Sequence, residues 1–184
     1  FALNNDFSID PRFSIKWQFI SKHSLSFGFG KHSQLEDLKI YLVNKNVNGN
    51  LEYPNRDLSL SQALHYVVGY DWQITNNLRL KIEPYYQYLY NIPGKPGSSY
   101  SLINFTQDWA FRDSLANNSK GRNYGIDLTL ERFLNDGYYF LITTSVFKSI
   151  YSGDDGIWRR TKFDKGYVAN MLFGKEFNLQ NNKL

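Results

Sequence analysis

Residues 78–91 read LRLKIEPYYQYLYN, and almost every second side chain in this stretch is apolar or aromatic. Arg79, Lys81 and Glu83 occupy the alternate positions, and Leu89 is the main exception to the pattern. A period of two residues is typical of a β-strand whose two faces meet different surroundings. The apolar set predicted to share one face is Leu78, Leu80, Ile82, Pro84, Tyr86, Tyr88 and Tyr90.

The same alternation recurs along the chain and predicts seven strands in all. In segment 138–149 both sets of alternate positions are largely apolar, so the pattern does not assign its faces. Short turn sequences and long polar stretches separate the strands in alternation. The other predicted strands are 11–20, 24–33, 61–74, 123–132, 138–149 and 167–177, and the long stretches are 34–60, 92–122 and 150–166.

Strands of about 10 residues joined by alternating short and long connections are typical of transmembrane β-barrels. Strands in soluble sandwiches are usually shorter. Trp72 and Tyr138 lie beside short turns, whereas Tyr86, Tyr88 and Tyr90 approach a long stretch. These are the places where two interfacial aromatic girdles are expected. The sequence therefore predicts an all-β antiparallel barrel with short periplasmic turns and long extracellular loops.

Pro84 departs from this pattern because it has no N–H to donate to a neighbouring strand. In a barrel each strand is paired on both sides. We therefore predict a local bulge at Pro84.

Composition narrows the function classes. The 184 residues include no cysteine, which excludes disulfides, thiolate metal sites and a cysteine nucleophile. The net charge of +4 comes from scattered Lys and Arg residues without a basic run, so nucleic-acid binding is not predicted. The sequence starts with Phe-Ala-Leu, which indicates a part of a longer chain, and we treat 1–184 as one partial barrel domain.

Segments 78–93 and 123–133 resemble consecutive barrel strands of TonB-dependent receptors of the Gram-negative outer membrane. Gly137-Tyr138-Tyr139-Phe140 and Gly174-Lys175-Glu176-Phe177 extend the resemblance to nearly the whole chain. The specificity of the resemblance lies in the succession of these segments, since no single segment is diagnostic.

The resemblance implies a barrel of about 22 strands closed by a plug, of which about a third is present here. It also implies energy transfer from TonB through a plug that this sequence does not contain, and import of a scarce nutrient. Loop composition leaves glycans, peptides, siderophores and cobalamin open as ligands. The resemblance implies no enzymatic activity and no cofactor.

Four carboxylates on the predicted polar faces could imitate the paired acids of a glycosidase. We interpret them instead as the lining of a wet lumen, balanced by Arg79 and Lys81. The three histidines share no ligand spacing, so no metal site is predicted. The carboxylates are Glu83, Asp127, Glu131 and Glu176.

Two loop motifs also have ordinary explanations. Residues 94–99 lack the Gly-Lys-Ser/Thr order of a phosphate loop, and we interpret them as a flexible loop. Asp154-Asp155-Gly156 is too short for a calcium loop and is interpreted as a solvated turn.

The long loops carry aromatic and guanidinium groups that a strand face does not explain. Such groups commonly serve recognition. They are the predicted ligand-binding residues, although packing of the loops against each other or against a partner lipoprotein explains them equally well. The set is Trp109, Phe111, Arg112, Trp158, Arg159 and Arg160.

Two other functions remain open at this point. One is a soluble all-β carbohydrate-binding module, which would bury the face that carries Tyr86, Tyr88 and Tyr90. The other is a small barrel enzyme or adhesin of about 8 strands, for which the loops offer no catalytic cluster.

Overall fold

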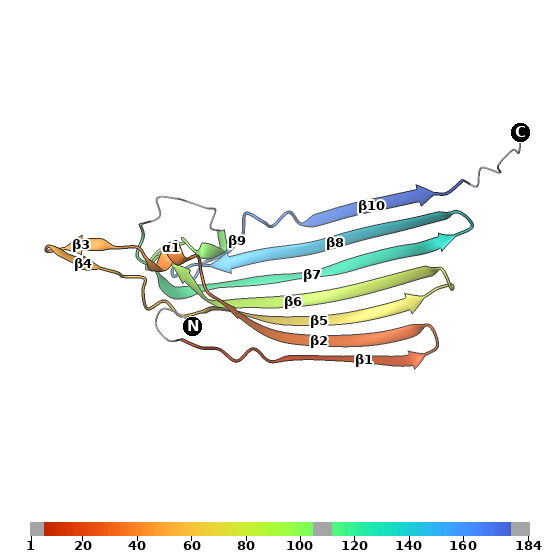
Figure 1. Cartoon of the computed structure of the whole chain (residues 1–184), viewed down its shortest axis with the longest axis horizontal. Helices are drawn as coiled ribbons and strands as arrows, with labels where there is room; N and C mark the ends of the chain where they lie inside the picture. The colour runs from red at the N-terminus through yellow and green to blue at the C-terminus, as the bar shows by residue number, and fades with distance from the viewer. Residues whose placement is uncertain (1–5, 105–111, 178–184) are drawn as a thin grey trace, which may run out of the picture.

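The computed structural model describes residues 6–104 and 112–177 and consists of one long antiparallel sheet (Figure 1). The path through the sheet is β1-β2-β5-β6-β7-β8-β10, and short β9 pairs with β8. These strands are β1 (Arg12–Ile20), β2 (His23–Gln34), β5 (Ser61–Gln73), β6 (Leu78–Gly94), β7 (Ala116–Asn135), β8 (Tyr138–Ser152), β9 (Trp158–Arg160) and β10 (Tyr167–Lys175).

Smaller elements fill the long connections. They are α1 (Leu38–Tyr41), the hairpin of β3 (Lys45–Val47) and β4 (Asn50–Glu52), and the 3-10 turn η1 (Leu102–Asn104). Neither helical segment in the described part of the chain is long and apolar enough to cross a bilayer.

All seven predicted strands are present, and the main difference is the length of the central ones. Strand β7 begins at Ala116, seven residues before the predicted start at 123. Most of its added residues are polar. Pairing with both neighbouring strands holds them in place, since Gly121 lies opposite Leu89 of β6 and Lys120 opposite Ser152 of β8. Cross-strand pairing here overrides a weak intrinsic strand preference.

Short turns lie at one end of the sheet and long connections at the other (Figure 1). The predicted turn 134–137 is confirmed, with φ of 53° at Asp136 and 77° at Gly137. Positive φ at two successive turn residues matches the twist of the strands that a tight hairpin joins. We call the two ends the turn end and the loop end.

The strand register places the predicted apolar sets on one common face. Phe13 pairs with Phe29, Phe29 with Tyr66, and Tyr66 with Tyr86. Ile126 continues the face to Val146 of β8, which assigns the faces that the sequence left open in 138–149. We call this the apolar face and the opposite side, which carries the alternate residues, the polar face.

The predicted bulge at Pro84 is wrong. Pairing between β5 and β6 lapses opposite Glu83 and Pro84, but the register is the same on either side, with Val67 opposite Tyr85 and Tyr70 opposite Ile82. Pro84 stays paired with Ile126 of β7. The missing N–H therefore removes ladder contacts on one side without requiring an extra residue. The nearest irregularity in β6 comes later, between Leu89 and Ile92, where Asn91 has φ of 54°.

The sheet is not closed. Among the described residues β1 and β10 each have a single strand neighbour, so they form the two edges. This open sheet represents only part of the predicted barrel.

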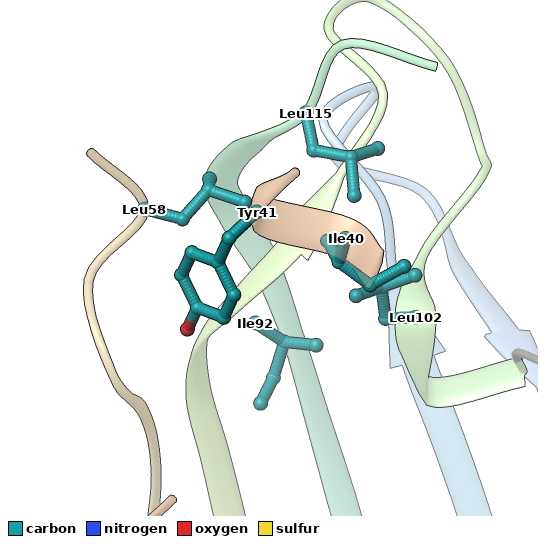
Figure 2. Close-up of a cluster of buried hydrophobic side chains, with 6 residues drawn as sticks. All are labelled: Ile40, Tyr41, Leu58, Ile92, Leu102 and Leu115. Atoms are coloured by element: carbon teal, nitrogen blue, oxygen red, sulfur yellow. The ribbon is translucent and has the colours of Figure 1, made fainter. Parts of the chain in front are cut away.

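A conventional core forms at the loop end rather than between layers of sheet. Ile40 and Tyr41 of α1 are almost completely buried and pack beside side chains from the connections on both sides (Figure 2). We call the packed connections 35–60 and 95–104 together with 112–115 the cap. The buried cluster comprises Ile40, Tyr41, Leu58, Ile92, Leu102 and Leu115.

Candidate functional site

The cap folds over the polar face of the sheet. Leu89, a polar-face position of β6, packs against the buried cluster together with Ile103. Gly121 of β7 lies beneath them, and a Cβ at this position would meet the Leu89 side chain at 2.9 Å and the Ile103 side chain at 3.0 Å. Glycine at this position thus allows the close approach of the cap to the sheet.

One buried side chain holds the cap connections together. Asn55 is 0% exposed, and its amide donates to the carbonyls of Ile40 at 3.0 Å and Asp113 at 2.9 Å. Its own oxygen accepts from the Leu115 N–H at 2.8 Å. Residues far apart in the sequence are joined through this one amide, so the connection that sequence reasoning treated as a simple loop is a packed structure.

A hollow of about 460 Å³ lies on the polar face below the cap. Its walls combine amide and hydroxyl groups from the strands with apolar side chains from the strands and the cap, and they include one charged residue, Glu36. The residues that line it include Tyr85, Gln87, Asn123, Phe147, Ser149 and Phe163.

A row of polar side chains crosses the floor of this hollow because the register sets them opposite one another. Gln87 lies opposite Asn123, and Asn123 opposite Ser149. The Asn123 amide donates to the Gln87 oxygen at 2.5 Å, and the Ser149 hydroxyl donates to the Asn123 oxygen at 2.6 Å. Thr161 extends the row by donating to the Ser149 hydroxyl at 2.8 Å.

Two histidines continue the row on the other side. His65 lies opposite Gln87, and the Gln87 Nε2 and His65 Nε2 atoms are 2.6 Å apart. The rings of His32 and His65 have their centroids 4.5 Å apart, and an Arg12 guanidinium nitrogen lies 3.2 Å from His32 Nδ1. Sequence reasoning missed this cluster because the residues are distant in the chain, and only the strand register reveals it.

The two histidine rings do not indicate a metal site. Across residues 6–104 and 112–177, no three His, Cys, Asp or Glu side chains gather in a way that could hold a metal ion. The row is a hydrogen-bonded surface of neutral polar groups that can contact a hydroxyl- or amide-bearing molecule.

A charged network occupies the polar face near the turn end. Arg79 donates to both carboxylate oxygens of Asp71, and Lys16 lies 3.9 Å from the same carboxylate. Arg79 also lies 3.9 Å from Glu131. Opposite charges thus alternate across β1, β5, β6 and β7.

Glu83 and Asp127 also have side-chain partners. Glu83 forms an ion pair with Lys81 at 2.7 Å, and Asp127 accepts a hydrogen bond from the Ser145 hydroxyl at 2.6 Å. Glu176 follows β10 and its N–H donates to the Gly137 carbonyl at 2.6 Å. The ion pairs of Glu83 and Glu131 agree with the interpretation of these carboxylates as a charge-balanced lining, whereas the contact of Glu176 involves its backbone alone.

The predicted ligand-binding residues have different surroundings. Trp109 and Phe111 lie outside the described residues, and Arg112 is exposed. Trp158 of β9 stacks on Arg122, whose guanidinium carbon lies 4.4 Å from the ring centroid. Ligand binding by this set stays a prediction.

The two arginines that follow Trp158 form local ion pairs. Arg159 pairs with Asp155 at 2.7 Å, and Arg160 pairs with Asp164 at 2.6 Å. The hydrogen bond from Arg159 holds the pKa of the Asp155 carboxyl below its usual value. These contacts order the third long connection, and they engage groups that were predicted to contact a ligand.

The two remaining loop motifs lie against each other. Asp154 accepts a hydrogen bond from the Gly97 N–H at 2.6 Å, and Gly153 packs against the backbone of Ser98 and Ser99. Residues 94–99, predicted to be a flexible loop, therefore contact the turn that contains Asp154-Asp155-Gly156.

The apolar face has no protein cover among the described residues. Val68, Ile126 and Val146 lie near its middle and are 44%, 48% and 56% exposed. Aromatic side chains gather at both ends of this band, with Trp17, Trp72 and Tyr138 at the turn end and Tyr88, Tyr90 and Trp158 at the loop end.

The height of the band follows from the register. Leu80 lies opposite Trp72, and Tyr88 lies eight residues further along the same strand. At a rise of about 3.4 Å per residue the two aromatic levels are roughly 27 Å apart. The apolar band of an outer-membrane barrel is about 25 Å tall.

No protein-family model and no curated protein sequence matches this chain. Its structure matches that of the FrpB iron transporter from Neisseria meningitidis (F3-3 variant), with a TM-score of 0.57 and 14% sequence identity over 94% of this chain. The match spans 25% of the transporter chain. The resemblance to TonB-dependent receptors is thus confirmed at the level of the fold, as an open part of such a barrel.

Proposed function

We propose that this chain is part of a TonB-dependent receptor of the outer membrane that takes up a scarce nutrient. The observation that carries the proposal is the uncovered apolar face, which is bounded by aromatic side chains and has the height of a bilayer's hydrocarbon region. The similarity to part of the FrpB iron transporter supports the same conclusion.

The polar face is proposed to line the lumen. Charged pairs such as Arg79 with Asp71 are stable on a surface that water or a plug domain covers, and they would be costly against lipid. The cap folds over this face at the loop end, where a nutrient would enter. Its hollow and the row of Gln87, Asn123 and Ser149 are proposed to contact the nutrient during passage.

The remaining parts of the proposal concern the longer protein. Further strands would pair with the open edges of β1 and β10, since unpaired backbone groups are not tolerated in lipid. A plug domain would connect the barrel to the TonB complex, and a surface lipoprotein could cover the loop end. A non-catalytic role agrees with the transporter likeness.

The soluble carbohydrate-binding module is the second candidate. It requires protein to cover the face that carries Tyr86, which is 38% exposed here. The described part of the chain supplies no such cover, so this observation favours the receptor.

The first test uses the full-length natural protein. We expect it to fractionate with the outer membrane and to migrate faster on gels before heating than after heating, as folded barrels do. Recovery of the protein in the aqueous fraction without detergent would contradict the receptor and favour the module.

A further inference from the structure

We propose that a basic patch on the apolar face binds the phosphate groups of a glycolipid in the outer leaflet. The patch consists of Lys120, Arg122 and Lys148, which are all exposed. This inference rests on the proposed outer-membrane function and goes beyond it by assigning a lipid-binding site to the outer surface of the sheet.

The register places the three cations together. Arg122 lies opposite Ile150, and Lys148 lies opposite Tyr124, two residues further along β7. Lys120 lies opposite Ser152, two residues along β7 in the other direction. Arg122 and Lys148 are diagonal neighbours, which are about 7–8 Å apart across antiparallel strands. Lys120 lies about 7 Å from Arg122 along β7, on the side away from Lys148, so the three groups form a row that can contact one headgroup with two separated phosphates.

The level of the patch matches a headgroup region. Arg122 lies opposite Tyr88, which belongs to the aromatic level at the loop end. Long basic side chains at this level can lay their aliphatic parts on the apolar band and extend the charge toward the membrane surface. The acyl chains of the same lipid would then contact the band below, near Ile126.

The patch lacks internal charge compensation. Within the described residues no ion pair engages Lys120, Arg122 or Lys148. The nearby carboxylates have other partners, since Asp155 pairs with Arg159 and Asp164 pairs with Arg160. Three cations at a lipid-facing surface are therefore available to an external anion.

Trp158 orients the central member of the patch. Its ring lies 4.4 Å from the Arg122 guanidinium carbon. Stacking on one face of the guanidinium leaves its N–H edge free, and this edge matches two phosphate oxygens.

The turn end of the same face is different. Arg132, on the same strand and the same face, lies 3.5 Å from the Asp136 carboxylate and over the Tyr138 ring at 4.1 Å. Its charge is compensated within the chain. On β7, the basic residue at the turn end is thus compensated while Arg122 at the loop end is not, and the proposed topology directs the loop end to the outer leaflet. Lys175, on the same face at the turn end of β10, lies 4.9 Å over the Phe177 ring.

The test uses the full-length natural protein in a neutral detergent, titrated with lipid A, a phosphorylated glycolipid, and with dephosphorylated lipid A. Each basic residue near a membrane surface strengthens binding of anionic lipid about fivefold. We expect the triple variant Lys120→Gln, Arg122→Gln, Lys148→Gln to bind lipid A about a hundredfold more weakly. The single variant Lys148→Gln should lose about fivefold, and it serves if the triple variant fails to fold.

Arg132→Gln is the matched control and should bind lipid A as the natural protein does. The proposal is overturned if the triple variant keeps the natural affinity, if dephosphorylated lipid A binds equally well, or if Arg132→Gln weakens binding as strongly. Competition by inorganic phosphate alone would assign the patch to a free anion and would also overturn it. Heat-dependent gel migration of each variant tests the receptor function separately, since a barrel can form without the lipid site.

Discussion

The cap and the apolar band contain similar side chains in opposite surroundings. Ile40 in the cap is 1% exposed, whereas Ile126 in the band is 48% exposed. The cap buries its apolar groups against the chain itself, as a water-soluble domain does. The band leaves its groups uncovered over several adjacent strands, which is typical of a surface built for hydrocarbon. The comparison teaches that one chain buries one set of apolar side chains and leaves another uncovered, as the proposed receptor requires.

The largest expected effect comes from a charge in the middle of the band. Val146→Arg should destabilise the full-length protein in lipid by about 2–4 kcal/mol, because the guanidinium would lie at the depth of the hydrocarbon. The free energy of unfolding in lipid vesicles, followed by heat-dependent gel migration, measures this loss.

Thr143→Arg is the matched control, since Thr143 lies on the polar face of the same strand, opposite Thr129. We expect a much smaller change there. Equal losses for the two variants would mean that the faces have been assigned wrongly or that neither contacts lipid.

A smaller and more local effect is expected in the cap. Asn55→Ala removes the hydrogen bonds to Ile40, Asp113 and Leu115 and leaves their backbone groups buried without partners. Such a change costs about 1–3 kcal/mol for a buried group. Hydrogen exchange at the Leu115 amide should accelerate while the strands keep their protection.

Asn46→Ala provides the comparison for the cap variant. Asn46 accepts one hydrogen bond from the Gly49 N–H in the exposed β3–β4 hairpin. Its substitution should leave exchange at Leu115 unchanged. Loss of strand protection in Asn55→Ala would show that the cap and the sheet unfold as one unit rather than separately.

The smallest expected effect is a pH dependence of the cap. Burial raises the pKa of Glu36 above its ordinary value of 4.5, against the lowering effect of the Ser61 hydroxyl that donates to it. The folded cap therefore favours the protonated carboxyl. This stabilisation is fully present below the ordinary pKa and is lost as the pH rises through the raised pKa.

Glu36→Gln should remove this pH dependence, since the amide stays neutral. Hydrogen-exchange protection of the cap, measured from about pH 4 to pH 8, compares the variant with the natural protein. Glu52→Gln, in the exposed β4 strand, is the control and should retain the natural slope. A slope of the opposite sign in the natural protein would contradict the effect of burial at Glu36.

The strands were predictable because each follows a simple period. Alternation in segments such as 78–91 identifies both the strand and its faces without knowledge of any neighbour. The pattern failed to assign faces in 138–149 because Phe147, on the polar face, is as apolar as Val146 on the other. Only the register with β7 resolves the two.

The candidate site was less predictable because its contacts are long-range. His32 and His65 are brought together by pairing of β2 with β5, and Asn55 looks like an ordinary turn residue in the sequence. The bulge predicted at Pro84 failed for a related reason. The lost N–H was foreseen, but the response of the neighbouring strand depends on β5, whose register remains unchanged.

The order β1-β2-β5-β6-β7-β8-β10 means that every long strand pairs with the long strands that precede and follow it in the chain. Loop closure between such neighbours costs little entropy, so each hairpin can form from nearby residues. The sheet can therefore grow in chain order, by successive addition of hairpins at a free edge, without threading a segment between strands that have already paired. A growing assembly of this kind exposes one new edge at each step, and the next hairpin to arrive covers it.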